Sequence, residues 1–239
     1  MIVELKELSK AYKKKTALAP LNLHIDQGEC IVLCGGNGAG KSTMIKMLTG
    51  VESPTTGSVV FHSKQRKPFA YMPDQMMFPA ELTPYEILDY YSRFLNKNKE
   101  TIKLALEKTG LWSERNQKAG GFSKGMSQRL NLAQCLLADT DIYILDEPTD
   151  GLDPYWVIQL KKIIKELKDK NKTIIISSHI MRDAIEIADK LIILFNGKIK
   201  FHGTLDQAYR EYKCSSLEEV FLSIHKRNTN RTETNSDSI

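Results

Sequence analysis

One run of small residues, closed by a lysine and a serine, has the composition of a phosphate-binding loop. Small residues let backbone N–H groups wrap the β- and γ-phosphates of a nucleotide, and a helix N-terminus behind them adds the positive end of its dipole. The lysine supplies a mobile cation to the same oxygens, and the serine hydroxyl can ligate Mg²⁺. The run fits the pattern G-x-x-x-x-G-K-[ST] and reads Gly35-Gly36-Asn37-Gly38-Ala39-Gly40-Lys41-Ser42, with Thr43 next.

Two acidic residues and a histidine offer groups for hydrolysis. Asp146 and Glu147 close an apolar run that begins at Ile142. Asp146 can hold Mg²⁺ through water, and Glu147 can polarise an attacking water as a general base. Two acids at a strand end can instead cap a helix, but the glycine loop upstream favours the catalytic interpretation. His179 follows another apolar run, where it would point into the crevice of an α/β sheet and bond a γ-phosphate or the attacking water.

The apolar runs around these residues predict the elements that position them. CIVLC, at 30–34, reads as a strand covered on both faces, and Met44, Ile45 and Leu48 give the next segment helical spacing. Strands that alternate with helices imply parallel pairing through right-handed crossovers. The further strands expected are 142–145, 174–176 and 191–195, with helices at about 154–169 and 180–188 between them.

Other parts surround this core. Apolar residues alternate with polar ones at 3–5 and 21–25, as in an antiparallel sheet, and Asn196-Gly197 predicts a tight hairpin. Helical spacing predicts a lobe inserted at about 80–138, with Tyr91 and Phe94 in its core. We expect a single domain over 1–225, ending in short helices at about 205–212 and 216–225, and a disordered polar tail over 226–239.

Composition excludes several classes of protein. The apolar share is 41% and the charged share 26%, as in soluble globular proteins. No apolar stretch approaches the roughly 20 residues that span a bilayer, and the start lacks a signal-peptide core. We therefore expect a cytosolic chain that meets a membrane only through a partner. The net charge of +5 is too small to indicate a nucleic-acid partner, and the four cysteines lack zinc-binding spacing.

The segment Phe122-Ser123-Lys124-Gly125-Met126-Ser127-Gln128-Arg129 resembles the LSGGQxQR signature of the nucleotide-binding subunits of ABC transporters. From the residues alone, Ser123 can cap a helix over 123–137, and Gly125 allows an oxyanion to approach closely. The resemblance covers nearly all of 1–225. It implies a P-loop NTPase core of α/β class, with a mostly parallel sheet, an N-terminal antiparallel β subdomain and an inserted α-helical subdomain. It also implies an ATPase that uses ATP and Mg²⁺.

In that family, two ATPase subunits enclose ATP, and the signature of one binds the γ-phosphate held by the other. The resemblance thus implies a homodimer, or a pair of ATPases, in which Ser123, Gly125 and Met126 contact the partner's nucleotide. Tyr12 lies where the family has an aromatic that stacks on adenine. Asp150-Gly151-Leu152-Asp153 matches the loop that crosses the dimer interface.

Met72-Pro73-Asp74-Gln75 matches the glutamine loop, which senses Mg²⁺ and touches the membrane subunit. Asp74 directly follows the proline and Gln75 is one further on, so either can approach the metal. Met76, Met77 and Phe78 come next, in a proline-flanked loop where consecutive burial is difficult, and we expect them to receive a helix of the membrane partner.

Lys124 and Met126 depart from the usual glycine and glutamine of the signature. This SKGM form, with the proline-acid loop, is similar to ATPases of ABC-2-type exporters and of the copper-linked system that matures nitrous oxide reductase. The implied function is ATP hydrolysis at the cytoplasmic face of the cell membrane, driving a separate permease whose residues choose the cargo. One alternative is a soluble ABC ATPase with a non-transport partner, and the single glycine loop and the lack of long heptad segments argue against it. The other is a binding module without turnover, and Glu147 argues against that.

Overall fold

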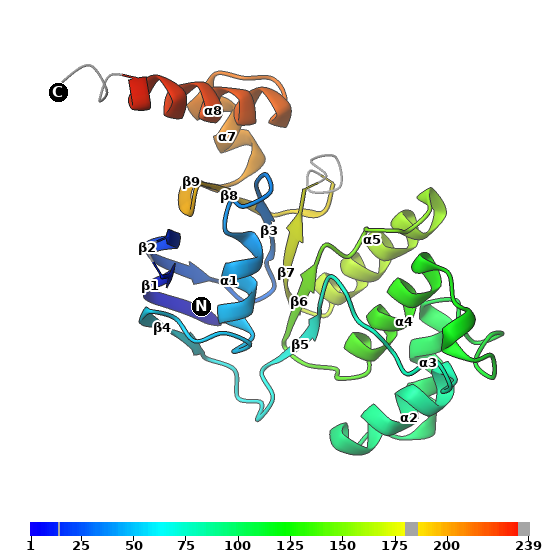
Figure 1. The fold of residues 1–239 in the computed structure, drawn as a ribbon. Coiled ribbons are helices and arrows are strands. Elements are labelled where there is room, and N and C mark those ends of the chain that lie inside the picture. The colour runs from blue at the N-terminus through cyan, green and yellow to red at the C-terminus, as the bar shows by residue number, and fades with distance from the viewer. Residues whose placement is uncertain (14, 180–185, 234–239) are drawn as a thin grey trace.

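Two β-sheets and a helical lobe make up the molecule (Figure 1). The computed structural model describes residues 1–13, 15–179 and 186–233, without the side chains beyond Arg227. The larger sheet has the strand order β5-β6-β7-β3-β8-β9 and the smaller one β2-β1-β4. The strands are β1 Val3–Tyr12, β2 Lys15–Ile25, β3 Cys30–Cys34, β4 Thr56–Phe61, β5 Phe69–Met72, β6 Ile142–Asp146, β7 Thr173–Ser178, β8 Lys190–Phe195 and β9 Lys198–Gly203.

The larger sheet is parallel from β5 to β8, as the alternation of strands and helices predicted. Every residue of β3, β6 and β7 is buried, because helices and the smaller sheet cover both faces. Parallel strands bring their carboxyl ends to one edge. The glycine loop after β3, Asp146 at the end of β6 and His179 after β7 therefore meet there.

Two antiparallel pairings also agree with the sequence. Strand β1 pairs antiparallel with β2 and β4, and this smaller sheet packs with helix α1, Lys41–Leu48, over one face of the larger sheet. Strands β8 and β9 form the expected hairpin. Asn196 and Gly197 have φ values of 47° and 72° there, the left-handed conformations that a two-residue type I′ turn requires.

The helical lobe contains α2 Pro84–Leu95, α3 Lys99–Lys108, the 3₁₀ helix η1 Ala119–Gly121 and α4 Lys124–Leu136. It buries its own hydrophobic cluster, centred on Leu88, Leu106 and Leu130. Tyr91 packs against this cluster as expected. The prediction for Phe94 was wrong, since that side chain is 62% exposed and stacks edge-on against Tyr90 at the lobe surface.

The other helices are α5 Pro154–Asp169, α7 Leu205–Tyr212 and α8 Leu217–Glu233, and they cover the second face of the larger sheet. The helix expected at about 180–188 falls mostly outside the described residues. Helix α8 continues past Lys226, where the sequence predicted a polar tail without regular structure. None of the helices in the described part of the chain has the length and apolar character needed to cross a bilayer.

Candidate functional site

A cleft of about 580 Å³ opens at the carboxyl edge of the larger sheet. The glycine loop forms its floor from Gly36 to Thr43, and Gly35 lies just behind them. Residues from five other parts of the chain complete the lining, which shows that the topology gathers the chemistry into one place. They are Tyr12, Lys15, Thr16, Ala17, Asp74, Glu147, Asp150, His179, Asn196 and Gly197.

Lys41 is held inside this cleft at the start of α1. Its side chain is largely buried, and Nζ donates a hydrogen bond to the carbonyl oxygen of Gly35 at 2.7 Å. The same ammonium lies 3.7 Å from Oε1 of Glu147. Among the described residues no side chain caps α1, and its first turn carries no acid. The first N–H groups of α1 are therefore free of a capping side chain and lie beside the ammonium of Lys41. This arrangement suits an anion such as a phosphate.

Asp146 ends β6 and lies 6% exposed behind the cleft lining. Burial raises the pKa of its carboxyl group, and a hydrogen bond donated by Ser177 Oγ to Oδ1 opposes that rise. Ser42 is among the residues that line the cleft. These hard oxygen donors suit Mg²⁺, which keeps water and substrate phosphates as its other ligands. Within the described ranges no three His, Cys, Asp or Glu side chains gather to hold a metal.

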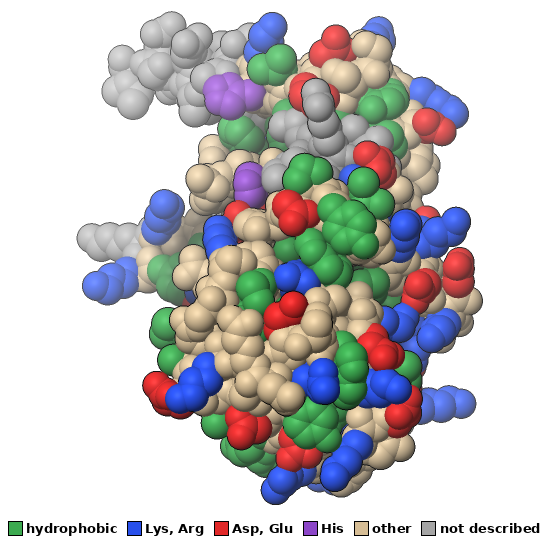
Figure 2. All heavy atoms as spheres, turned by 90° about the vertical axis from the view of Figure 1, so that its right-hand side faces the viewer, with side chains coloured by type: hydrophobic (Ala, Val, Ile, Leu, Met, Phe, Trp, Pro, Cys, Tyr) green, Lys and Arg blue, Asp and Glu red, His purple; other side chains and the backbone are tan. Residues whose placement is uncertain are grey.

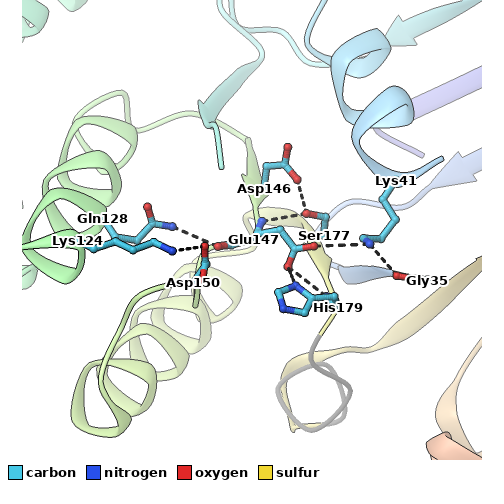
Figure 3. A network of polar contacts seen from close by, with 9 residues as sticks. All are labelled: Gly35, Lys41, Lys124, Gln128, Asp146, Glu147, Asp150, Ser177 and His179. Carbon is cyan, nitrogen blue, oxygen red and sulfur yellow. Dashed lines mark hydrogen bonds and ion pairs between the residues drawn. The ribbon is translucent and has the colours of Figure 1, made fainter. Parts of the chain in front are cut away.

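Glu147 is tied to His179 as well as to Lys41 (Figure 3). Nδ1 of His179 lies 2.7 Å from Oε2 of Glu147, and the backbone N–H of His179 donates to the same oxygen at 3.1 Å. The histidine thus contacts the carboxylate expected to act as the base, and both side chains line the cleft.

Asp74 and Gln75 are separated by the fold. Asp74 lines the cleft, whereas Gln75 is exposed and lies outside the lining. Burial raises the pKa of Asp74, and the negative charges of Asp150 and Glu147 add to the rise. Burial, with the charges of Asp146 and Asp74, also raises the pKa of Tyr71 to about 12. The structure thus brings Asp74 to the site and leaves Gln75 out.

The signature segment borders the cleft of its own chain, where Lys124 and Gln128 contact the lining residues Asp150 and Glu147. Ser123 caps α4, accepting a hydrogen bond from the N–H of Met126 at 3.2 Å, as the sequence predicted. Neither Ser123, Gly125 nor Met126 lines the cleft. Gly125 packs so closely on the next loop that a Cβ there would lie 2.9 Å from the carbonyl oxygen of Gly151. Lys124, the residue that departs from the usual glycine, pairs with Asp150 at 2.7 Å.

Tyr12 lines the mouth of the cleft and is 42% exposed. Its hydroxyl donates to the carboxylate of Glu52, and the ammonium of Lys10 lies 5.1 Å from the ring centroid. The ring is therefore anchored at its edge while much of it stays accessible to a ligand.

Sequence reasoning missed two residues that contact Glu147. Ser177 Oγ accepts a hydrogen bond from the backbone N–H of Glu147 at 2.9 Å, and Gln128 Nε2 donates to the Glu147 carbonyl oxygen at 3.2 Å. The position of Ser177 at the end of a buried strand, just before His179, was a usable signal. Nothing in the sequence indicated that Gln128, from the helical lobe, would reach this strand.

Comparisons with known proteins agree with this geometry. A family model described as ABC transporter matches residues 18–150. The chain is 35% identical to the uncharacterized ABC transporter ATP-binding protein YxlF of Bacillus subtilis, over 95% of this chain and 78% of that protein. It is also 35% identical to the lantibiotic transport ATP-binding protein SrtF of Streptococcus pyogenes, over 92% of this chain and 96% of that protein.

Solved structures give the same result. A structure described as an ATP binding subunit of an ABC transporter superposes with a TM-score of 0.87 at 31% identity, over 94% of this chain and all of the other. The dimeric structure of MJ0796, a bacterial ABC transporter cassette, superposes with a TM-score of 0.77 at 25% identity, over 85% of this chain and 99% of the other. The family resemblance and the fold predicted from the sequence are confirmed.

Proposed function

The chain belongs to the ABC transporter family, whose ATP-binding subunits are ATPases, and we propose that it pairs with a second ATPase subunit around ATP to drive a separate membrane permease. The second subunit is another copy of this chain in the simplest arrangement.

The observation that carries the pairing is the separation of two anion-binding elements. The loop ending in Lys41 lines the cleft, but the N-terminus of α4, with Ser123 and Gly125, does not. A helix N-terminus capped by serine and followed by a glycine favours an oxyanion. One chain thus presents two half-sites, and a second chain turned against it would complete both. The dimeric cassette MJ0796, which shares the fold, is a precedent for such an assembly.

Several residues in the cleft, with Asp146 behind its lining, then have defined tasks. Lys41 and the N–H groups at the start of α1 would bind the β- and γ-phosphates, and Tyr12 would stack on the adenine. Ser42 and Asp146 would hold Mg²⁺, which neutralises phosphate charge when bound. Glu147 would accept a proton from the attacking water. His179 holds the carboxylate of Glu147 in place through two contacts, which limits its rotation.

An exposed methionine in the loop that follows Asp74 supports docking of a permease at the cytoplasmic face of the membrane. In the loop between β5 and α2, the side chain of Met77 is 96% exposed, while Phe78 packs against the cluster of the helical lobe. Figure 2 shows that the side of the molecule carrying the helical lobe has hydrophobic side chains at its surface between charged ones. The relative SrtF is named for lantibiotic transport, and we propose an export-type permease, of the ABC-2 kind, for this chain too.

The decisive experiment traps the paired state. Glu147→Gln removes the base but keeps the shape of the side chain, so the purified variant should dimerise with Mg-ATP and remain dimeric, while ADP leaves it monomeric. The matched variant adds Ser123→Asp, which retains an N-cap for α4 but places a carboxylate where the partner's γ-phosphate would bind. Light scattering should report dimers for the first variant and monomers for the second.

A monomer for Glu147→Gln at saturating Mg-ATP would refute the homodimer. Dimers of equal stability in both variants would show that the N-terminus of α4 takes no part in binding the nucleotide.

A further inference from the structure

Glu147 has a backbone conformation that few residues other than glycine adopt. Its φ is 47°, in the left-handed region, directly after the fully buried strand β6. Such a conformation in a non-glycine residue is strained and persists only where surrounding contacts impose it. The direction in which the Glu147 carboxylate points therefore depends on the groups that hold its backbone.

Two side chains hold that backbone from opposite sides. Ser177, fully buried on β7, accepts a hydrogen bond from the Glu147 N–H at 2.9 Å. Gln128, 7% exposed on α4, donates to the Glu147 carbonyl oxygen at 3.2 Å. Ser177 lies on β7, the strand next to β6, and the Glu147 carbonyl oxygen also accepts from the backbone N–H of Asp150 at 3.1 Å. Of the two side chains, Gln128 is the one that reaches this backbone from the helical lobe (Figure 3).

Gln128 makes one of several contacts that the structure describes between α4 and the segment that begins at Glu147. Lys124 pairs with Asp150 at 2.7 Å, and Gly125 approaches the carbonyl oxygen of Gly151 too closely to allow a Cβ. The start of α4 and residues 147–151 consequently form one packed unit. A shift of the start of α4 should therefore displace Glu147, because Gln128 bonds the Glu147 carbonyl oxygen directly and Gly125 leaves no room for a Cβ against Gly151.

We propose that Gln128 is a positioning residue, which makes the placement of the Glu147 carboxylate depend on the position of α4. The consequence rests on the proposed function, in which the N-terminus of α4 binds the nucleotide of the other subunit. Each chain would place the N-terminus of its α4 in the partner's cleft and Glu147 in its own cleft. ATP bound in the partner's cleft would therefore fix the position of α4, and with it the position of Glu147 in the first chain's own cleft. Hydrolysis at one site of the pair is then coupled to occupancy of the other through Gln128.

The test compares two glutamines of the same helix. Gln128→Met keeps the side-chain length but cannot donate to the Glu147 carbonyl. Gln134→Met removes a hydrogen bond of the same kind, which Gln134 Nε2 donates to the carbonyl oxygen of Tyr71 at 3.0 Å, away from Glu147. Full-length variants are compared by steady-state ATP hydrolysis, by ATP binding and by thermal unfolding.

Gln128→Met should lower kcat roughly 10- to 100-fold, since a base displaced by about 1 Å loses that much, while KM and ATP affinity stay within about twofold of the wild type. Gln134→Met should leave kcat within about twofold. Gln128→Lys restores a donor of similar reach and should recover part of kcat. If Gln128→Met does not fold, Gln128→Glu, which matches the shape of glutamine but presents a carboxylate to the carbonyl, replaces it and should show the same fall.

Equal kcat values for Gln128→Met and wild type, or equal losses in the two glutamine variants, would overturn the proposal. So would a fall in kcat that is matched by lost ATP affinity. The Gln128→Met change in the Glu147→Gln background should still dimerise with ATP. If Glu147→Gln itself stays monomeric, the paired ATPase fails as a function, and that outcome is separate from the kcat comparison.

Discussion

The ammonium of Lys41 lies 3.7 Å from Oε1 of Glu147, and the two side chains are 8% and 15% exposed. This pair joins the glycine loop after β3 to the end of β6, two segments far apart in the sequence. A cation so placed can serve both the carboxylate and a phosphate oxygen, because ammonium has three donors.

Replacing Lys41 with alanine should lower the rate of ATP hydrolysis about 100-fold or more, because it removes a positive charge aimed at the phosphates. The fold should survive, since among the described residues the side chain gives up the hydrogen bond to the Gly35 carbonyl and the ion pair with Glu147. Phosphate release and thermal unfolding measure the two effects. Lys190→Ala is the control, since Lys190 pairs with Glu29 at the opposite end of the strands. Turnover near the wild-type rate in Lys41→Ala would refute the phosphate assignment.

Removal of Mg²⁺ with EDTA should stop turnover, and Asp146→Asn should do the same in the presence of the metal. The variant should be at least as stable as the wild type. Burial raises the pKa of Asp146, so ionised Asp146 is less favourable in the folded than in the unfolded chain at neutral pH, and asparagine removes that cost while still accepting from Ser177. Thermal unfolding at pH 7 checks the sign. A large loss of stability in Asp146→Asn would instead show that the carboxylate has a structural role.

The two residues of the glutamine loop should differ in their effect on catalysis. Asp74 lines the cleft beside Asp150 and Glu147, whereas Gln75 is exposed. Asp74→Asn should therefore change kcat, or the Mg²⁺ concentration that gives half-maximal activity, by more than Gln75→Ala does. A magnesium titration of both variants makes the comparison. The opposite order would mean that the loop rearranges before catalysis and brings Gln75 to the metal.

Met77→Asp should weaken association with the permease. Burying a methionine at an interface contributes about 1.5–3 kcal/mol, so recovery of the permease on the tagged chain should fall by about tenfold or more. Stability should hardly change, because this side chain is 96% exposed. Leu222→Asp, at an apolar side chain 60% exposed on α8, is the matched control and should copurify normally. Equal recovery with Met77→Asp and wild type would place the docking surface elsewhere.

The structure also revises part of the docking prediction. Met76, Met77 and Phe78 were expected to act together, because consecutive burial in a proline-flanked loop is difficult. Phe78 instead turns into the helical lobe and Met77 projects outward, so we expect Met77 to make most of the contact with the permease. Tyr91 and Phe94 show the same limit of periodicity: both have helical spacing, but only Tyr91 reaches the lobe core.

Local features were determined by the sequence alone. The glycine loop, the carboxylates after 142–145, the serine cap of α4 and the Asn196-Gly197 turn each depend on contiguous residues, whose conformational preferences and hydrogen bonds act within a few positions. These were enough to predict the family, the parallel core and part of the cleft lining, namely the glycine loop, Glu147 and His179.

Only the tertiary structure decided which of two neighbouring candidates enters the site and which distant residues support it. Asp74 rather than Gln75 lines the cleft, and Gln128 reaches the carbonyl oxygen of Glu147 from a separate lobe. The parallel register of β6 and β7, which places Asp146 opposite Ser177, likewise brings together residues remote in the sequence. Such contacts depend on strand register and on the docking of helices, and no local pattern specifies either, because the burial that stabilises them is shared among all the packed elements.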